Sequence, residues 1–599
     1  MSDSTTLHAT IIDRWTQQVA AHPEDVALHW RTKSYTFGEL GELVDQMASW
    51  LRTHCCKSGD VVATTLPRSA EAIIAQLAII HAGATHLAID PRGAPGRTSA
   101  ILRDAKPAYV LDYARWQLAM DDLWRPPQRH REQPRPRSGA NANTVATPSS
   151  AAYLVYTSGS SGAPKGVLVE HRSLANLLLE HERHLFPLAT QAAGRPRLRV
   201  AHAIALSFDA AWDPLLWMVG GHELYLLSDE VRADAALMDQ AILDNALDVV
   251  EVTPGLAGQL VQRGLFHLSH APSLLLTGGE AVGQGLWTEL AAAPRTVAIN
   301  LYGPSECTVF ATWARVDRYP RPVIGHPIAG TMCQVVDAEG RPLPDGSVGE
   351  LVLSGTCVAR GYHDRAELTA ERFSAVSDME GVWRSYRTGD LVRRSADGAL
   401  EFHGRADRQV KIRGHRIELG EIEATLLAHP DVDQAVVKLR DDAGSSDLVA
   451  YVVGPDDGVL PDLELKEFLA DRLPQVMIPA VFLRAGELPL TSHGKVDFDA
   501  LTLPPRSPAF TPPDPLRGEL EARLGKAFCS VLKLDRIGRN DSFFDLGGHS
   551  LLAAVIAENL RRDGVACTLP DIMGNPRIAD LAKELGALAC RGAPAKETA

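Results

Sequence analysis

The sequence predicts a large α/β domain at the N-terminal end, followed by a smaller α+β domain and then an all-α domain. Short apolar segments of strand length alternate with helical patterns as far as about residue 405. A charged strand pattern and an amphipathic helix follow, and beyond a proline-rich stretch the last segment has helical periodicity throughout. Since 599 residues exceed what one hydrophobic core holds, we expect separate domains.

The first of these regions, residues 1–406, is expected to fold as a large α/β core. Apolar strands separated by helices favour a mostly parallel sheet, because parallel strands need crossover connections. The clearest strand segments are 61–64, 109–111, 249–252 and 274–276. Residues 125–148 interrupt the pattern with Pro, Arg and small polar residues, which is typical of a surface loop.

The remaining segments predict two smaller domains. The strand pattern at 409–413 leads into a helix at 417–427, which places an α+β domain at 407–503. Residues 504–516 are rich in proline and predict a semi-rigid, extended linker. Residues 517–588 predict a small helical bundle, with a short tail at 589–599.

Charge and composition exclude several classes of function. The formal net charge of −14 argues against a nucleic-acid partner or an anionic membrane, because both would repel such a surface. The N-terminus lacks the basic start and apolar core of a signal peptide, and no apolar run approaches the ~20 residues of a membrane helix. The eight cysteines show no metal or disulfide spacing. We therefore expect a cytoplasmic protein.

Residues 156–166 are the strongest sign of chemistry. They combine hydroxyls, glycines and Lys165 directly behind the apolar segment 151–155. Glycines allow backbone N–H groups to turn inward and the lysine adds a mobile positive charge, so the segment predicts a polyphosphate cradle. It is not a P-loop, because Gly166 follows the lysine where Ser or Thr would be required. The alternative is a polar surface turn, but a buried strand before it and Pro-Lys-Gly within it favour phosphate binding.

Further motifs occur in a fixed order along the chain. They are YTFGEL at 35–40, NLYGPSE at 300–306, YRTGDL at 386–391, GRADRQVKIRG at 404–414 and PLTSHGKVD at 489–497. Together they resemble the adenylation domain of nonribosomal peptide synthetases, within the adenylate-forming superfamily, over about residues 10–503. The motif DSFFDLGGHSL at 541–551 resembles the phosphopantetheine attachment site of a peptidyl carrier domain. Ser161 and Ser305 stand where threonine is common, and both keep the hydroxyl.

The resemblance implies an adenylation core with a smaller mobile subdomain and a four-helix-bundle carrier. It implies an ATP-dependent ligase that joins an amino acid to AMP with Mg²⁺ and then forms a carrier-bound thioester. Glu306 would bind Mg²⁺, Tyr302 would stack on adenine, and Lys495 would meet the substrate carboxylate and the α-phosphate. The other implied nucleotide-binding residues are Thr157, Ser158, Gly159, Ser160, Ser161, Gly162, Lys165, Gly303, Asp390 and Arg405.

The second half-reaction needs a thiol, which the resemblance assigns to a 4′-phosphopantetheine arm on Ser550. The alternative for Ser550 is a simple helix N-cap. Lys495 must leave before the thiol enters, and the resemblance implies that the small subdomain rotates about a hinge at Asp407. Lys411 and Gly414 would then border the thiol tunnel.

The resemblance also implies an amino-acid pocket in which Asp209 pairs with the substrate ammonium. The other matching positions are Phe208, Ala210, Trp212, Gly255, Leu276, Gly278, Leu301, Val309 and Phe310. If Trp212 lies in the pocket, the lining is apolar apart from the groups that hold the substrate ammonium and carboxylate. Such a lining predicts valine as the preferred substrate, with leucine or isoleucine next. The segment after Asp209 is one residue shorter than the usual pattern, so Asp213 could take this place and allow a polar or basic side chain.

Partners follow from the same resemblance. A phosphopantetheinyl transferase would install the arm, and an MbtH-like protein is a possible partner. The sequence ends about fifty residues after Ser550, so an acceptor protein in trans is expected to take the loaded amino acid. Two alternatives remain: an acyl- or aryl-acid adenylating enzyme fused to an acyl carrier, against which Asp209 argues, and a non-catalytic carrier and interaction protein.

Overall fold

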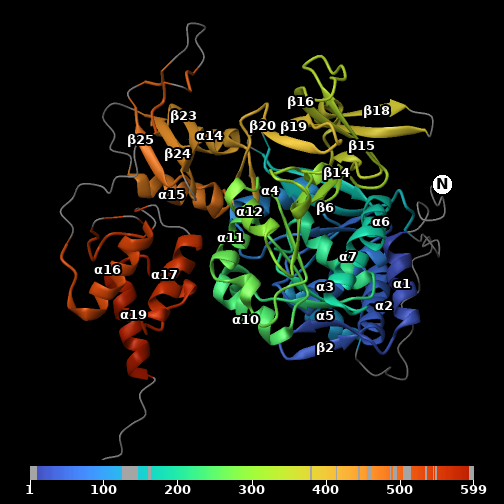
Figure 1. Ribbon diagram of the computed structural model, residues 1–599, viewed down its shortest axis with the longest axis horizontal. Helices are drawn as coiled ribbons and strands as arrows, with labels where there is room; N and C mark the ends of the chain where they lie inside the picture. Colours follow the sequence, from blue (N-terminus) through green and yellow to red (C-terminus); the bar gives the residue numbers. More distant parts are fainter. Residues whose placement is uncertain are drawn as a thin grey trace, which may run out of the picture. The chain divides into compact units, whose positions relative to one another are not determined.

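The computed structural model describes residues 10–591 (Figure 1), apart from 124–145, 160–162, 378–380, 413, 443–444, 455–460, 486, 490–495, 499, 504–513, 533, 535, 544–545 and 547–549. The chain divides into two compact units. The first comprises Met1–Ser228 and Asp239–Glu418, and the second comprises Asp229–Met238 and Leu419–Ala599. The proline-rich linker and the loop at 125–148 fall almost entirely outside the described residues.

A nine-stranded sheet forms one half of the first unit. Its strands in spatial order are β14 (His326–Pro327), β13 (Thr312–Arg315), β12 (Val297–Tyr302), β11 (Leu274–Gly278), β10 (Val249–Val252), β8 (Arg199–His202), β9 (Glu223–Leu226), β1 (Val26–Trp30) and β2 (Lys33–Thr36). The strands from β12 to β1 pair in parallel, and antiparallel strands flank them at both edges. The expected parallel pairing is confirmed for this sheet.

A six-stranded sheet forms the other half. Its order is β17 (Gly361–Tyr362), β7 (Lys165–Glu170), β6 (Ala151–Thr157), β4 (Thr85–Ala88), β3 (Val61–Thr64) and β5 (Tyr109–Leu111). Helix α3 (Ala70–His81) contacts β3 and β4 of this sheet and β1 of the nine-stranded sheet, so it lies between the two. Its sequence AEAIIAQLAIIH is apolar around nearly its whole circumference, as expected for a helix buried on all sides.

A third sheet completes the first unit, and the sequence pattern did not separate it from the α/β region. It contains β15 (Thr331–Val336), β16 (Val348–Gly355), β19 (Val382–Arg394), β18 (Phe373–Ser377) and β20 (Leu400–Arg405), all in antiparallel pairs. The short antiparallel pair β21 (Val410–Ile412) and β22 (His415–Ile417) follows it in the chain.

The other helices of the first unit cover these sheets. They are α1 (Ile11–Ala21), α2 (Phe37–His54), α4 (Pro95–Ala105), α5 (Tyr113–Leu123), α6 (His171–Glu180), α7 (Phe186–Ala193), α8 (Trp212–Val219), α11 (Pro254–Gln262), α12 (Gln284–Ala291) and α13 (Ala366–Arg372). Helix α2 shows why such helices begin where they do. The Thr36 hydroxyl accepts from the Glu39 backbone N–H, and the Glu39 carboxylate accepts from the Thr36 N–H, which forms a capping box.

The second unit contains the α+β and the all-α parts that the sequence predicts. Strands β23 (Gln434–Asp442), β24 (Ser445–Val453) and β25 (Val481–Arg484) form a three-stranded sheet, with α14 (Leu419–Leu427) packed on β23 and α15 (Asp462–Ala470) on α14. Helices α16 (Gly518–Leu532), α17 (Ser550–Arg562), α18 (Leu569–Gly574) and α19 (Ile578–Arg591) pack around one apolar cluster. The expected fold class is thereby confirmed.

Candidate active site

The site is built where parallel strands of the nine-stranded sheet end. Tyr302 closes β12, and the chain then turns through Gly303 to Glu306, which lies in a short 3₁₀ helix. A Cβ on Gly303 would lie 2.5 Å from the Phe310 Cα, so this turn admits only glycine. The carboxyl ends of parallel strands are the usual place for ligand sites in α/β folds.

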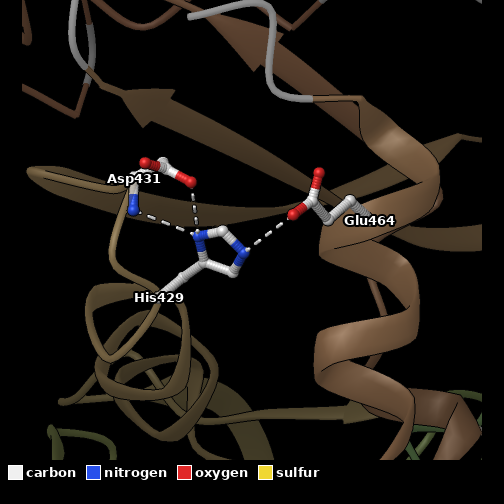
Figure 2. A group of neighbouring side chains, drawn as sticks. All are labelled: His429, Asp431 and Glu464. Atoms are coloured by element: carbon white, nitrogen blue, oxygen red, sulfur yellow. Dashed lines mark hydrogen bonds and ion pairs between the residues drawn. The ribbon is translucent and has the colours of Figure 1, made fainter.

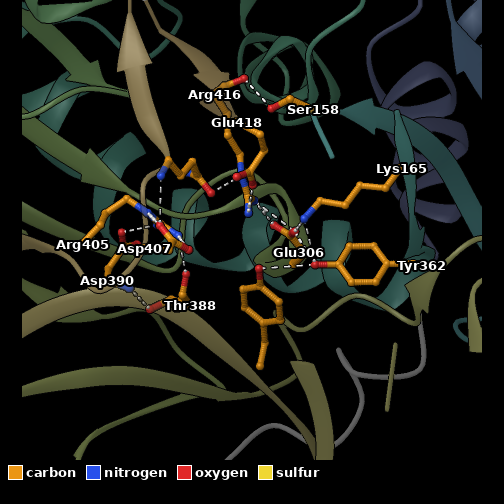
Figure 3. Close-up of polar contacts among 12 residues, drawn as sticks. Ser158, Lys165, Glu306, Tyr362, Thr388, Asp390, Arg405, Asp407, Arg416 and Glu418 are labelled. Carbon is orange, nitrogen blue, oxygen red and sulfur yellow. Dashed lines mark hydrogen bonds and ion pairs between the residues drawn. The ribbon is translucent and has the colours of Figure 1, made fainter. Parts of the chain in front are cut away.

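Glu306 is the centre of the charged network in Figure 3. It is fully buried, and both of its carboxylate oxygens accept from the Arg416 Nη1, at 2.8 and 3.0 Å. The Tyr362 hydroxyl donates at 2.8 Å, and the Lys165 Nζ lies 3.7 Å away. Burial alone would raise the pKa of Glu306, but Arg416 and Lys165 together lower it to about 2. The group is therefore an anion at neutral pH.

These residues fit a magnesium ion. A buried, ionised carboxylate is the oxygen ligand that Mg²⁺ prefers, and one or two protein carboxylates commonly suffice when phosphate oxygens complete the shell. Lys165, which the sequence places at the end of the phosphate segment, lies beside it. An ion bound here would share Glu306 with the Arg416 guanidinium or displace it, because the Arg416 Nη1 donates to both oxygens.

The described ends of the phosphate segment belong to two paired strands. Thr157 ends β6 and pairs directly with Lys165, which begins β7. The Ser158 hydroxyl donates to the Arg416 carbonyl at 2.7 Å. Burial, with Arg416 nearby, lowers the pKa of Lys165. Gly159 is described at the start of the turn, whereas Ser160, Ser161 and Gly162 lie outside the described residues.

A second network joins the residues expected at the nucleotide. The Tyr302 hydroxyl donates to one oxygen of Asp390, and Arg405 donates to the other. Asp390 and Arg405 are register partners on β19 and β20. The Asp407 carboxylate accepts from the Arg405 Nε at 2.6 Å and from its Nη2 at 2.8 Å. The structure therefore brings together all four residues, three from the expected nucleotide site and one from the expected hinge.

The β21–β22 pair lies at the same site. The Gly414 N–H donates to the Glu280 Oε1 at 2.7 Å, and the Lys411 Nζ lies 5.8 Å from the centroid of the Tyr302 ring. Arg416 extends from β22 onto Glu306. The sequence motif pointed to Lys411 and Gly414 but not to Arg416, because one arginine in a charged strand pattern carries no signal of burial.

The amino-acid side of the site begins at Phe208, Asp209 and Ala210. Asp209 opens a 3₁₀ helix, and its carboxylate accepts from the Ala210 N–H at 2.8 Å. Burial raises the pKa of Asp209, while a hydrogen bond from Ser305 opposes this rise. Asp209 thus lies beside the residue that precedes Glu306.

The next two residues, Trp212 and Asp213, begin α8 and have different surroundings. Trp212 stacks on Tyr153, with ring centroids 5.5 Å apart, and presents an edge to His86. Asp213 is fully buried, and its Oδ1 lies 2.8 Å from the His181 Nε2. Burial lowers the pKa of His181, but the neighbouring Asp213 carboxylate raises it, and the net effect is a raised pKa.

The other expected pocket positions lie on the ends of neighbouring strands and the loop after them. Leu276 and Gly278 belong to β11, Leu301 belongs to β12, and Gly278 and Leu301 are register partners. Val309 and Phe310 follow Glu306, and Phe310 lies 5.7 Å from His181 between ring centroids. Gly255 lies in the first turn of α11, where a Cβ would have no described atom within 4 Å.

Glu251 is a residue that the sequence did not indicate. It lies in β10 as the register partner of Leu276, with 8% of its surface exposed. Its Oε2 makes no hydrogen bond to any described residue. Burial raises its pKa well above the usual value, and the carboxylates of Asp213 and Asp209 raise it further. The sequence did contain one sign of this residue: Glu251 is the one acid in an otherwise apolar strand segment. Buried strands seldom contain an unpaired charge, so such an acid is a candidate functional residue.

The second unit holds a separate group of possible metal ligands, His429, Asp431 and Glu464 (Figure 2). The His429 Nδ1 accepts a hydrogen bond from the Asp431 backbone N–H at 3.2 Å, and its Nε2 lies 3.9 Å from the Glu464 Oε1. The ring also packs edge-on against Phe468 at 4.8 Å. These contacts use His429 for packing and loop geometry, and both acids are largely exposed.

Two expected catalytic residues have little structural description. Ser550 is the first residue of α17, and its side chain lies outside the described part of the chain. Lys495 also lies outside it.

Comparison with known proteins identifies the family. The family model of the AMP-binding enzyme matches residues 15–363, that of the AMP-binding enzyme C-terminal domain matches 421–495, and that of the phosphopantetheine attachment site matches 522–585. The first match alone covers more than half of the chain. The chain belongs to the AMP-binding enzyme family. Its three matches give it the organisation of a nonribosomal peptide synthetase adenylation domain joined to a peptidyl carrier domain.

Relatives and solved structures share this organisation. Vanchrobactin synthetase VabF from Vibrio anguillarum is 34% identical over 98% of this chain and 21% of its own length. Tyrocidine synthase 3 from Brevibacillus parabrevis is 35% identical over 94% of this chain and 9% of its own length. The chain thus spans a quarter or less of these curated relatives.

One similar solved structure is holo-PA1221, an NRPS protein containing adenylation and PCP domains bound to a vinylsulfonamide inhibitor. It is 26% identical to this chain, with a TM-score of 0.77, and the match covers 97% of each chain. A four-domain nonribosomal peptide synthetase bound to AMP and glycine is 29% identical, with a TM-score of 0.57, and covers 97% of this chain and 43% of that one.

The family assigns the adenylation–carrier protein its cofactors: ATP with Mg²⁺, and 4′-phosphopantetheine on the carrier. Ser550 fits the phosphopantetheine arm, because it begins a helix within the matched region and a helix N-terminus favours phosphate. Of the helices in the described ranges, not one has the length and apolar character needed to cross a bilayer.

Proposed function

We propose that the adenylation–carrier protein activates an amino acid with ATP and loads it onto its own carrier domain. The observation that carries this proposal is the half-buried Asp209 carboxylate, which accepts a hydrogen bond from Ser305, lies near Glu306 and has a pKa raised by desolvation. A buried carboxylate in a substrate pocket is costly unless a cation pairs with it, and the α-ammonium of an amino acid supplies one. An acyl or aryl acid without an amine would leave Asp209 unpaired.

In the first half-reaction, a carboxylate oxygen of the amino acid attacks the α-phosphorus of ATP. A new P–O bond forms, the bond to the bridging oxygen breaks, and pyrophosphate leaves with its electron pair. All the reacting groups are anionic, so catalysis here is mainly neutralisation and alignment. Lys165 and the phosphate segment would hold the β- and γ-phosphates, and Lys495 would neutralise the carboxylate and α-phosphate. Magnesium bound to Glu306 would add charge neutralisation on the phosphate oxygens.

In the second half-reaction, the arm on Ser550 supplies a thiol nucleophile that accepts the aminoacyl group as AMP leaves. Lys495 would have to move away first. We assign the hinge of this movement to Asp407 and the border of the thiol path to Lys411 and Gly414. Contacts of Gly414 with Glu280 and of Arg416 with Glu306 are consistent with a state in which the β21–β22 pair has entered the site.

The identity of the amino acid depends on the residue beside the pocket at the start of α8. If Trp212 lines it, valine is expected first and leucine or isoleucine next. If Asp213 lines it, a polar or basic side chain is expected. In both cases a phosphopantetheinyl transferase and an acceptor of the loaded amino acid are the expected partners, with an MbtH-like protein as a further candidate. Because ATP is a substrate and coenzyme A is the donor of the phosphopantetheine arm, we assign the protein to the cytoplasm.

Amino-acid-dependent exchange of pyrophosphate into ATP tests the first half-reaction, and the intact mass of the phosphopantetheinylated protein tests the second. We expect exchange with an amino acid and a matching mass increase on the carrier. The Asp209→Ala variant should lose at least about 100-fold in kcat/KM for the amino acid, because its ammonium loses a buried partner. Exchange with fatty or benzoic acids that Asp209→Ala leaves unchanged would instead favour the acyl- or aryl-acid alternative.

A further inference from the structure

Three carboxylates converge on the amino-acid side of the site: Asp209, Asp213 and Glu251. We propose that the pocket takes an amino acid with a cationic side chain, such as lysine or ornithine, and that Asp213 and Glu251 receive its side-chain cation. This inference rests on the proposed function, because it needs Asp209 to hold the α-ammonium of the same substrate.

The first step of the argument is the orientation of α8. Trp212 is engaged with the aromatic rings of Tyr153 and His86, which come from strands of the six-stranded sheet. Asp213 contacts His181 and interacts with Glu251 from the nine-stranded sheet. Glu251 in turn pairs in register with Leu276, one of the expected pocket positions. Asp213, and not Trp212, is therefore the residue linked to the strands that carry the pocket.

The second step is a balance of charges. Asp213 can pair with the His181 imidazolium, because its Oδ1 lies 2.8 Å from the His181 Nε2. Phe186, Trp217 and Phe310 surround that imidazole, and its Nδ1 is fixed by the Leu177 carbonyl at 2.8 Å. His181 can offset one of the two acids. The second acid has no such partner among the described residues.

The third step concerns that second acid. Glu251 is more than nine-tenths buried, and its Oε2 has no hydrogen-bond partner in the described structure. Burial raises its pKa well above the usual value, and so do Asp213, through its charge and a side-chain hydrogen bond, and then Asp209. Lys411 interacts instead with Asp390 and Asp209. Without a cation, Glu251 is therefore held protonated, in a hydrogen bond with Asp213. An incoming ammonium would let Glu251 ionise and pair with it, which an aliphatic side chain cannot do.

Pyrophosphate exchange with matched substrates tests the proposal. Lysine and ornithine are compared with norleucine, which has a similar chain without the terminal ammonium, and with valine, leucine and glutamine. We expect the highest kcat/KM with lysine or ornithine, at least about 100-fold above norleucine, because only a cation satisfies the buried acid. The same cargo should appear in the intact mass of the loaded carrier.

Variants then assign the effect to the carboxylates. Glu251→Gln and Asp213→Asn should each lower kcat/KM for lysine and ornithine at least about 10-fold, and Glu251→Leu should raise norleucine above lysine. The control is Glu289→Gln on α12, an exposed carboxylate, which should leave the profile unchanged. If these variants fail to fold, the wild-type profile decides alone.

The outcomes separate this inference from the proposed function. Best exchange with valine, leucine, norleucine or glutamine overturns the inference and leaves amino-acid activation intact. Exchange with none of the amino acids, together with exchange with an acyl or aryl acid, overturns both. A lysine or ornithine preference that survives both Glu251→Gln and Asp213→Asn also overturns it, because other groups would then recognise the cation.

Discussion

At the scale of single residues, the active site is a set of buried charges that must be paired in each state. Glu306 illustrates this, because the carboxylate that would bind Mg²⁺ is here paired with Arg416 through both oxygens. A metal ion on Glu306 would compete with Arg416 for the same oxygens. We therefore propose that Arg416 and Mg²⁺ alternate on Glu306 between the two half-reactions.

Arg416→Ala should therefore separate the two half-reactions. Removing one member of a buried ion pair is costly, so the β21–β22 pair should lose its contact with Glu306 and thioester formation should fall by about 10- to 100-fold. Pyrophosphate exchange should fall less, because Glu306 and Lys165 remain for the metal and phosphates. Single-turnover loading and exchange measure the two steps. A parallel fall in both, with Arg416→Lys no better than alanine, would contradict the alternation.

The pKa of Glu306 yields a prediction about pH. Its folded value of about 2 lies below the ordinary 4.5. A depressed carboxyl pKa contributes stability that is complete above the unfolded value and is lost as pH falls toward the folded value. The Tm difference between wild type and Glu306→Gln should thus be constant from pH 8 to about pH 5 and should shrink below about pH 4.5. Calorimetry across this range measures it, and a difference that already shrinks between pH 7 and 5 would contradict the pairing.

At the scale of elements, strands with continuous apolar runs were predicted best. The segments 61–64, 109–111 and 249–252 coincide with β3, β5 and β10, because short, mostly apolar runs stand out between helical patterns. The third sheet was not predicted as a separate sheet, because a strand pattern in the sequence does not show which strands pair with each other. Glu251 and Arg416 were missed for a related reason: whether a charge in a strand faces solvent or a site depends on contacts distant in the sequence.

The segment between β20 and β21 carries the prediction for the hinge. Asp407→Pro would fix the backbone φ there and should impair thioester formation more than adenylation. The variant also removes three hydrogen bonds, because the Asp407 carboxylate accepts from Arg405 at 2.6 and 2.8 Å and from the Gln409 N–H at 3.2 Å. Asp407→Ala is the matched control, since it loses the same bonds but keeps a rotatable φ. Both half-reactions are measured on each variant.

If Asp407 is the hinge, the proline variant should lose at least about 10-fold more thioester formation than the alanine variant, with similar pyrophosphate exchange. Equal loss of both half-reactions in Asp407→Pro would count against a hinge at this residue. Equal loss in the proline and alanine variants would assign the effect to the ion pair with Arg405.

At the scale of the whole molecule, adenylation and carrier domains in one chain would make the proposed loading an intramolecular step. The family matches place the AMP-binding regions and the phosphopantetheine region in sequence order, and residues 504–516 join them. A short linker keeps the arm at an effective concentration on the order of millimolar, far above the concentration of a second protein in an assay. The chain should therefore load itself in preference to a neighbouring copy.

Mixing two complementary variants tests this preference. Ser550→Ala can make aminoacyl-AMP but has no arm, whereas phosphopantetheinylated Lys495→Ala has the arm but should not adenylate. At about 1 µM of each, loading of the Lys495→Ala carrier by its partner should be slower than self-loading of the wild type by on the order of 100-fold or more. Intact mass over time follows both, and Lys495→Ala alone sets the background. Loading of the mixture at the wild-type rate would mean that the tether gives no advantage and that the carrier is served as readily between molecules as within one.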